Sequence, residues 1–206
     1  MSSQPRKLLI ATGSRHKFGE LRDLLDLRNT ELVSLPDVGL EDDADEIGAT
    51  FAENATIKAR HYAAQSGLPT LADDSGIEVD ALGGRPGVKT RRYAGPKATD
   101  EQNNRKLLGE LADFYGPDER TARYRCVLVL VEDGAVVEQT DGVFEGRIAF
   151  AGRGKNGFGY DPIFEPDFEA PGGRTVGQMP AGEKNRVSHR AKAARAMHER
   201  LLARGY

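Results

Sequence analysis

Hydrophobic and polar positions repeat along this chain with two different periods, and these periods predict its elements. Residues 7–12 (KLLIAT) form a short apolar run, which is typical of a buried strand. After Gly13-Ser14, helical spacing relates Phe18, Leu21, Leu24 and Leu25. Residues 31–35 predict a second strand, so the N-terminal part reads as a βαβ unit.

Two further helices are indicated by capping boxes. Thr50 with Glu53 opens a helix that we expect to run through Ala64, and Thr99 with Gln102 opens another. The second helix carries Leu107, Leu108, Leu111 and Phe114. Between the two helices, residues 68–72 predict a third strand, and residues 77–82 predict a short element after it.

The second half of the chain favours antiparallel strands. Asp133-Gly134 separates residues 123–132 from 135–140, a strong hairpin signal, and residues 143–150 could pair with that hairpin. Loops are expected over 152–159 and 166–173, and a last helix over about 188–203, with Ala191, Ala194, Met197 and Leu201 facing inward. The pattern predicts an α/β fold with a mixed sheet in two lobes, flanking helices and a central cleft.

Composition narrows the class of protein. The 206 residues suffice for one domain with two lobes, and a net charge of −3 argues against a nucleic-acid partner, which needs a broad basic surface. One cysteine excludes an intrachain disulfide, and the histidines show no zinc-ligand spacing. A polar N-terminus and the absence of an apolar run of ~18 residues predict a cytoplasmic protein without a membrane partner.

The acidic pair Asp73-Asp74 carries the strongest chemical signal. It follows the strand predicted over 68–72 and precedes Ser75-Gly76, so we expect it at the end of a strand, before a turn. Mg²⁺ prefers such hard oxygen ligands and completes its shell with water and phosphate. A polar turn without a ligand is the alternative. The glycine turn at 83–87 and the basic residues at 91–92 favour a metal–phosphate site.

A second candidate site lies where the first strand meets the first helix. The residues there are Thr12, Gly13, Ser14, Arg15, His16 and Lys17. A helix N-terminus attracts phosphate, Gly13 allows a close backbone approach, and Lys17 adds a charge. The alternative is an ordinary helix start with Ser14 as N-cap. The spacing is not that of a P-loop.

Two more segments offer contacts to a nucleobase. In Gly157-Phe158-Gly159-Tyr160-Asp161-Pro162, an aromatic ring between glycines can stand out as a stacking platform, although its aromatics could equally pack in the core. Lys184 and Ser188-His189-Arg190 supply hydrogen-bond donors at the start of the last helix. Alternatively, Ser188 is an N-cap and the next residues form a solvated first turn.

These motifs stand in the order seen in one family. They are Thr12-Gly13-Ser14-x-x-Lys17, Thr50-Phe51-x-Glu53-Asn54-Ala55-x-x-Lys58-Ala59, Ala72-Asp73-Asp74-Ser75-Gly76, Gly83-Gly84-x-Pro86-Gly87, Arg92-Tyr93-x-Gly95, Phe158-Gly159-Tyr160-Asp161-Pro162 and Ser188-His189-Arg190. The chain resembles the Ham1-like inosine triphosphate pyrophosphatases, the dITP/XTP house-cleaning enzymes, from about Leu8 to Leu202. The family usually has Asn where this chain has Ser14. Serine keeps a hydroxyl but lacks the second hydrogen-bond donor of the amide.

The resemblance implies a two-lobed α/β homodimer with a nucleotide-binding cleft. It also implies Mg²⁺ dependence, with Mn²⁺ as a substitute, and hydrolysis of dITP, ITP and XTP to monophosphate and pyrophosphate. By resemblance, Asp74 is the base that activates water and a metal ligand, and Glu46 or Asp45 is the second ligand. The triphosphate would contact residues 12–17 and Ser75. The base would contact Phe158, Gly159, Tyr160, Asp161, Lys184, His189 and Arg190.

The chemistry of the bases agrees with this assignment. Hypoxanthine and xanthine present a C6 carbonyl, which Lys184, His189 and Arg190 can donate to, whereas adenine would leave these donors unpaired. Two rivals stay open at this point: a related hydrolase for pyrimidine or methylated nucleotides, and a nucleotide-binding regulatory module without turnover. The presence of both Asp73 and Asp74 argues against the second.

Overall fold

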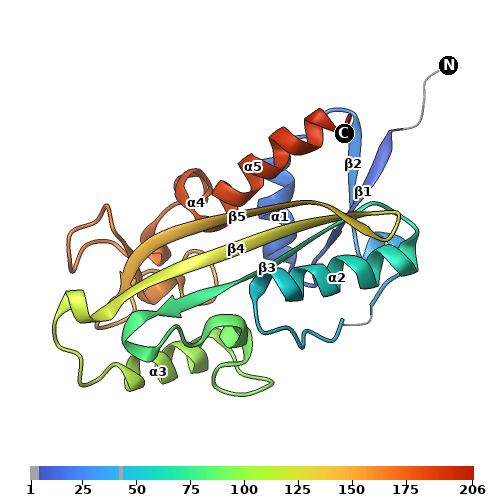
Figure 1. Ribbon diagram of the computed structural model, residues 1–206. Coiled ribbons are helices and arrows are strands. Elements are labelled where there is room, and N and C mark those ends of the chain that lie inside the picture. Colours follow the sequence, from blue (N-terminus) through green and yellow to red (C-terminus); the bar gives the residue numbers. More distant parts are fainter. Residues whose placement is uncertain (1–4, 42–43) are drawn as a thin grey trace. The chain divides into compact units, whose positions relative to one another are not determined.

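The computed structural model describes residues 5–41 and 44–206, and its strands form one mixed sheet (Figure 1). The strand order in that sheet is β2-β1-β3-β4-β5-β6. Strand β1 pairs in parallel with β2 and β3, and β5 pairs antiparallel with β6. The bounds are β1 Arg6–Ala11, β2 Thr30–Ser34, β3 Thr70–Val79, β4 Thr121–Glu132, β5 Ala135–Ile148 and β6 Phe164–Pro166. The predicted α/β class with a mixed sheet is confirmed.

The helices begin where the capping signals placed them. Their bounds are α1 Arg15–Leu25, α2 Phe51–Ser66, α3 Asp100–Glu110, α4 Ala181–Val187 and α5 His189–Ala203. Both capping boxes are formed, by Thr50 with Glu53 and by Thr99 with Gln102. Helix α4 was not predicted, because its sequence AGEKNRV shows no apolar period. Among the described residues, no helix is both long and apolar enough to span a membrane.

The hairpin prediction is confirmed, and its second strand is longer than expected. Asp133 and Gly134 both have positive φ, at 49° and 78°, as a two-residue type I′ turn requires. The segments expected separately over 135–140 and 143–150 are one strand, β5. The strand continues through Thr140 because its buried hydroxyl is satisfied, donating to the carbonyl of Ala193 at 2.9 Å.

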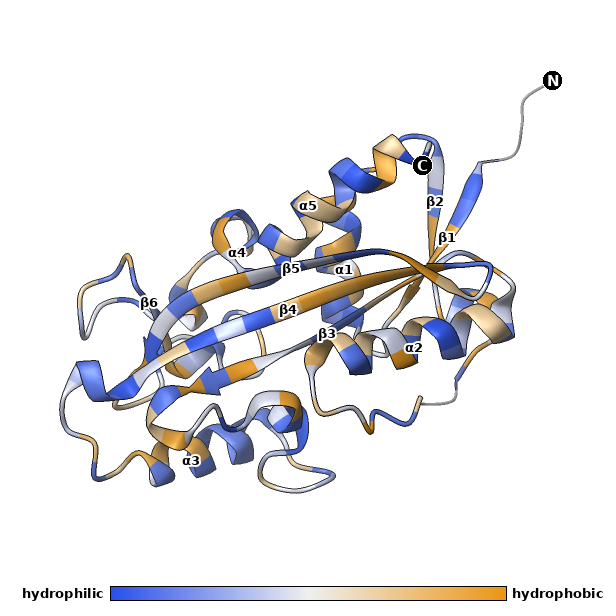
Figure 2. Cartoon of the chain, viewed as in Figure 1, coloured by the Kyte–Doolittle hydropathy of each residue, from blue (hydrophilic) through white to orange (hydrophobic). Residues whose placement is uncertain are grey.

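The chain divides into two compact units, each with its own hydrophobic core. Unit 1 takes in the chain up to Asp74, Cys126–Gly142 and Arg190–Tyr206, and unit 2 takes in Ser75–Arg125 and Val143–His189. In unit 1, α1 and α5 pack on the sheet through the buried residues Leu21, Leu25, Ala193, Ala194, Met197 and Leu201. The half of β4 in this unit is nearly all hydrophobic (Figure 2). Unit 2 has a separate core around Ile77, Tyr124, Phe164 and Tyr160.

In unit 1 both faces of the sheet are covered. Leu8 and Ile10 belong to the core shared with α1 and α5, while their neighbours Leu9 and Ala11 are also fully buried and point to the opposite face. Helix α2, which carries the buried residues Ala55, Ala59 and Tyr62, packs there. Because side chains alternate along a strand, the two adjacent acidic residues of β3 face opposite sides of the sheet.

The structure corrects the placement of the acidic pair. Strand β3 does not end before Asp73 but runs through Ser75-Gly76 to Val79, so the pair lies within a strand and no turn follows it. The strand continues because Ile77 and Val79 are fully buried and keep the alternation of side chains. The element predicted over 77–82 is therefore the end of β3 followed by one short turn of 3₁₀ helix, Asp80–Leu82.

Candidate active site

Asp73 lies on the sheet face that α1 and α5 cover, and it is surrounded by cations. Lys17 Nζ lies 3.0 Å from Asp73 Oδ2, and Arg190 Nη2 donates to the same oxygen at 3.2 Å. Arg190 also contacts Glu20 of α1, with Nη1 2.5 Å from Oε2. The side chains of Asp73 and Arg190 are 0% and 1% exposed. Asp73 thus joins the first turn of α1 to the first turn of α5.

Asp74, the next residue of β3, points to the opposite face, toward α2. Lys58 Nζ lies 3.6 Å from Asp74 Oδ1 and 3.0 Å from Glu46 Oε1. Asp74 Oδ2 is buried and accepts no hydrogen bond from the part of the chain that the structure describes. A buried carboxylate oxygen without a donor is poised to take a cation or a proton from a bound molecule.

The two carboxyl groups differ in acidity. Burial alone would raise both pKa values. Around Asp73, the cations of Lys17 and Arg190 outweigh burial and hold its pKa well below the usual range. For Asp74, burial prevails over the attraction of Lys58, so its pKa is raised. Asp73 is therefore a permanent anion, while Asp74 is the better proton acceptor.

The segment that carries Glu46 is fixed to the start of α2. Asn54, fully buried, accepts a hydrogen bond from the Gly48 amide through Oδ1 at 2.8 Å. A Cβ at Gly48 would lie 2.7 Å from that oxygen, so only glycine allows this approach. Glu53 Oε2 accepts from the amides of Ala49 and Thr50 at 2.7 and 3.1 Å. The carboxylate of Glu46 is thereby brought to Lys58.

These residues fit a magnesium ion. Within residues 5–41 and 44–206, no group of three or more His, Cys, Asp or Glu is placed to hold a metal. Mg²⁺ needs only one or two carboxylates because water and substrate phosphate supply the rest. Asp74 and Glu46 share the contact with Lys58, whereas Asp45 is exposed. Asp42 and Asp43, which precede Asp45 and Glu46 in an acidic segment of the sequence, lie outside the described residues.

The N-terminus of α1 has the geometry of an ordinary cap as well as that of an anion site. Ser14 is the N-cap: its hydroxyl accepts from the Lys17 amide at 3.4 Å, and its own amide donates to Thr12 Oγ1 at 3.2 Å. The alternative role predicted for Ser14 is therefore confirmed. Gly13, Arg15 and His16 are exposed beside it. The first turn thus offers charge and backbone amides next to Asp73.

In unit 2, Asp161 gathers the residues proposed to hold a base. Lys184 Nζ lies 2.8 Å from Asp161 Oδ2, and the Phe158 amide donates to the same oxygen at 2.9 Å. Tyr124 donates its hydroxyl proton to Asp161 Oδ1 at 3.3 Å. Lys184 also lies over the Phe158 ring, 4.3 Å from the centroid. The structure therefore brings together Phe158, Asp161 and Lys184, as the motifs suggested.

Of the other residues predicted to contact the base, His189 stacks on an aromatic ring and Tyr160 packs in the core. The ring of His189 stacks on that of Tyr124 with a centroid distance of 4.7 Å and an interplanar angle of 8°. Tyr160 is only 2% exposed and donates its hydroxyl proton to the Thr90 carbonyl at 2.9 Å. Its side chain packs in the core, as the alternative for this loop anticipated. Ser75, half-buried, follows Asp74 directly on β3.

Sequence reasoning missed two residues of these sites. Lys58 was quoted only as part of a motif, yet it bridges Asp74 and Glu46. Its signal was available, because it falls on the buried stripe of α2 with Asn54, Ala55 and Ala59, where a lysine needs an anionic partner. Tyr124 gave no comparable signal, because an aromatic residue in a strand usually belongs to the core.

The comparisons agree on one family. The sequence model of the Ham1 family matches residues 8–200. A dITP/XTP pyrophosphatase of Thioalkalivibrio sulfidiphilus is 47% identical over 201 residues, covering 96% of this chain and 100% of that relative. One of Methylococcus capsulatus is 46% identical over 203 residues, covering 96% and 97%. The solved structure of a HAM1 protein from Coxiella burnetii has a TM-score of 0.84 at 41% identity and covers 96% of this chain and 99% of that chain.

Proposed function

Because the chain belongs to the Ham1 family, we propose that it hydrolyses the triphosphates of non-standard purine nucleosides, dITP, ITP and XTP, to the monophosphate and pyrophosphate. The observation that carries this proposal is Asp74. It is a buried carboxylate of raised pKa, beside Lys58 and Glu46, and its Oδ2 accepts no hydrogen bond from the described residues. A site for attack on a phosphorus needs such a base together with cationic groups.

In the proposed reaction, Asp74 accepts a proton from the water that attacks the α-phosphorus. Its raised pKa increases its affinity for that proton, and ionised Asp73 on the other face holds Lys17 near the N-terminus of α1. Lys17 and the amides of that turn stabilise charge on the phosphate oxygens. Bound at Asp74 and Glu46, Mg²⁺ would polarise the water and neutralise the leaving pyrophosphate.

Unit 2 supports the choice of base. Lys184 is held by Asp161, and both are almost fully buried, at 6% and 2% exposed. A buried ammonium whose pose is fixed is a suitable donor for the C6 carbonyl of hypoxanthine or xanthine. Phe158 offers a ring face, and His189 a second nitrogen donor on the Tyr124 ring. Adenine has an amino group at C6 and would leave these donors unpaired.

Pyrophosphate release tests the proposal with a panel of dITP, XTP, dGTP, dATP and dUTP. We expect turnover of dITP and XTP with Mg²⁺ and much weaker turnover of dATP and dUTP. Equal rates across the panel, or a preference for dUTP, would refute the assignment and favour the rival pyrimidine hydrolase. Nucleotide binding without turnover would instead support the regulatory module.

We further propose that the protein acts as a homodimer and requires Mg²⁺ or Mn²⁺. The resemblance of nearly the whole chain to the family supports the dimer. Asp74 Oδ2, which accepts no hydrogen bond from the described residues, supports the metal. Light scattering coupled to gel filtration measures the mass of the assembly, for which a monomeric value contradicts the dimer. A fluorescent Mg²⁺ indicator that competes with the protein for the ion measures metal binding independently of turnover.

A further inference from the structure

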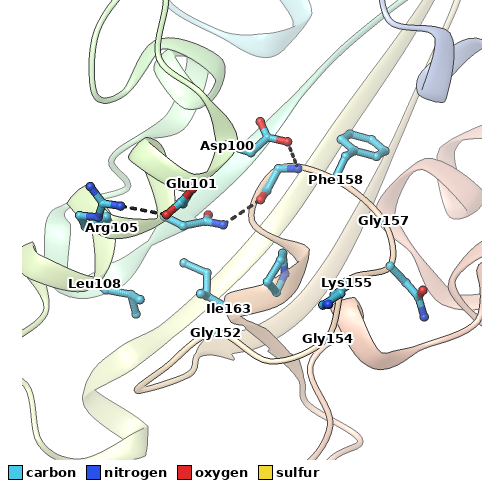
Figure 3. A pocket seen from close by; sticks show the side chains of 14 residues that line it. Asp100, Glu101, Arg105, Leu108, Gly152, Gly154, Lys155, Gly157, Phe158 and Ile163 are labelled. Carbon is cyan, nitrogen blue, oxygen red and sulfur yellow. Dashed lines mark hydrogen bonds and ion pairs between the residues drawn. The ribbon is translucent and has the colours of Figure 1, made fainter.

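In the Gly157-Phe158-Gly159 segment, both the amide and the carbonyl of Gly159 form hydrogen bonds with side chains of α3. The Gly159 amide donates to Asp100 Oδ2 at 2.7 Å, and Asn104 Nδ2 donates to the Gly159 carbonyl at 3.1 Å (Figure 3). Asp100 and Asn104 lie one turn apart on α3, so they face the same way. Two side chains of one helix thus hold both polar groups of a single residue.

Side-chain packing does not hold Gly159 itself. An open pocket of about 560 Å³ lies beside these hydrogen bonds, lined by Leu108, Pro162 and Ile163 and by residues 152 and 154–159 among others. A Cβ at Gly159 would meet nothing within 4 Å, and φ is +62°. Because Gly159 has no side chain and borders this space, hydrogen bonds rather than side-chain contacts fix its backbone.

The supporting end of α3 is itself well fixed. Asn103, 2% exposed, accepts from the Ala94 amide at 2.8 Å and donates to the Arg91 carbonyl at 3.0 Å. The Thr99 capping box closes the helix N-terminus. The N-terminal part of α3 is therefore held in place, and with it the side chains of Asp100 and Asn104 that bind the loop.

We propose that Asp100 and Asn104 are positioning residues that set the affinity for the substrate base. They act through Gly159 on its neighbour Phe158, whose amide binds Asp161 and whose ring lies against Lys184. A carboxylate acceptor makes the Asp100 bond the stronger of the two. This inference rests on the proposed function, because it assigns to α3 the control of the same base-holding loop.

Steady-state kinetics on dITP with four variants tests the inference. Asp100→Ala and Asn104→Ala each remove one bond, Asp100→Asn keeps an oxygen acceptor, and Glu101→Ala is the control. Glu101 is also an exposed residue in the first turn of α3, but it pairs with Arg105. We expect Asp100→Ala to raise KM about tenfold with kcat within about threefold, Asn104→Ala to raise KM less, and Asp100→Asn to restore most of the affinity.

Amide hydrogen exchange of residues 157–160 gives a readout that does not depend on turnover. We expect faster exchange there in Asp100→Ala and unchanged exchange in Glu101→Ala. A KM within twofold of the wild type together with unchanged exchange overturns the inference, as does a fall of kcat alone. A wild type that is inactive on dITP refutes the proposed function instead, and the exchange rates then decide whether α3 anchors the loop.

Discussion

Replacing Arg190 by methionine tests whether the ion pairs of Asp73 with Lys17 and Arg190 hold the first turns of α1 and α5 together. Arg190 is 1% exposed and contacts two carboxylates, Asp73 at 3.2 Å and Glu20 at 2.5 Å. Methionine fills a similar volume but carries no charge, so Asp73 would stay buried with one cation fewer. We expect a large loss of stability, because an uncompensated buried charge is costly.

The magnitude follows from the burial of the pair. Removing one partner of a buried ion pair costs about 3–5 kcal/mol. Lys17 stays 3.0 Å from Asp73 and compensates in part, which places the expected loss near the lower end, about 3 kcal/mol. A chain of 206 residues loses roughly 2–4 °C per kcal/mol, so we expect Tm to fall by about 6–12 °C.

Urea unfolding and thermal unfolding measure this loss, and Arg200→Met is the matched control. Arg200 lies on the same helix and contacts Glu138 at 2.7 Å, but it is 53% exposed, so its loss should cost at most about 1 kcal/mol. The lowered pKa of Asp73 stabilises the fold above the unfolded value of 3.8, and this contribution is lost as the pH falls. The difference between wild type and Arg190→Met should therefore shrink below about pH 4.

A change within about 0.5 kcal/mol for Arg190→Met would refute this reasoning. The same variant tests the hypothesis that Arg190 reads the base. If Arg190 donates to the C6 carbonyl, the kcat/KM preference for dITP over dATP narrows. If it only holds Asp73, both substrates lose activity in equal proportion.

Three further predictions concern the proposed chemistry. Asp74→Asn should keep the wild-type Tm within a few degrees and lower kcat on dITP by roughly 100-fold or more; near-normal turnover at saturating Mg²⁺ would disprove its role as base. Activity should disappear in EDTA and return with Mg²⁺. Glu46→Gln should raise the Mg²⁺ concentration needed for half-maximal activity more than Asp45→Asn does. The reverse order would point to Asp45 as the ligand. Gly157→Ala should raise KM, because its Cβ would lie 2.0 Å from Asp161 Oδ2 and φ is +75°; an unchanged KM would show that the loop adapts.

Elements encoded by local chemistry were predictable from the sequence. The capping boxes at Thr50 and Thr99 and the Asp133-Gly134 turn satisfy their own backbone within a few residues, and each was found where it was expected. Helix α4 lacked such a signal. Its buried Lys184 is stabilised by Asp161, 23 residues away in sequence, and that pairing exists only in the folded unit.

The end of β3 was mispredicted for a related reason. Two adjacent acids normally favour a turn, and nothing near them in sequence offsets their burial. The offset comes from Lys17, Lys58 and Arg190, which belong to three different helices. The motifs thus named the candidate site residues, while the partners of these residues, and the bridging role of Lys58, required the tertiary structure.

The neighbouring positions of Asp73 and Asp74 on one strand make unit 1 intolerant of small insertions and deletions. Because side chains alternate between faces, adding or removing one residue in β3 before Asp73 would turn each carboxylate to the other side of the sheet. Because both residues are aspartates and their surroundings set their pKa values, each carboxylate would lose the partners that define its role. Length changes are therefore tolerable only in the turns that flank β3, and a single-codon deletion inside the strand would take both carboxylates from their partners at once.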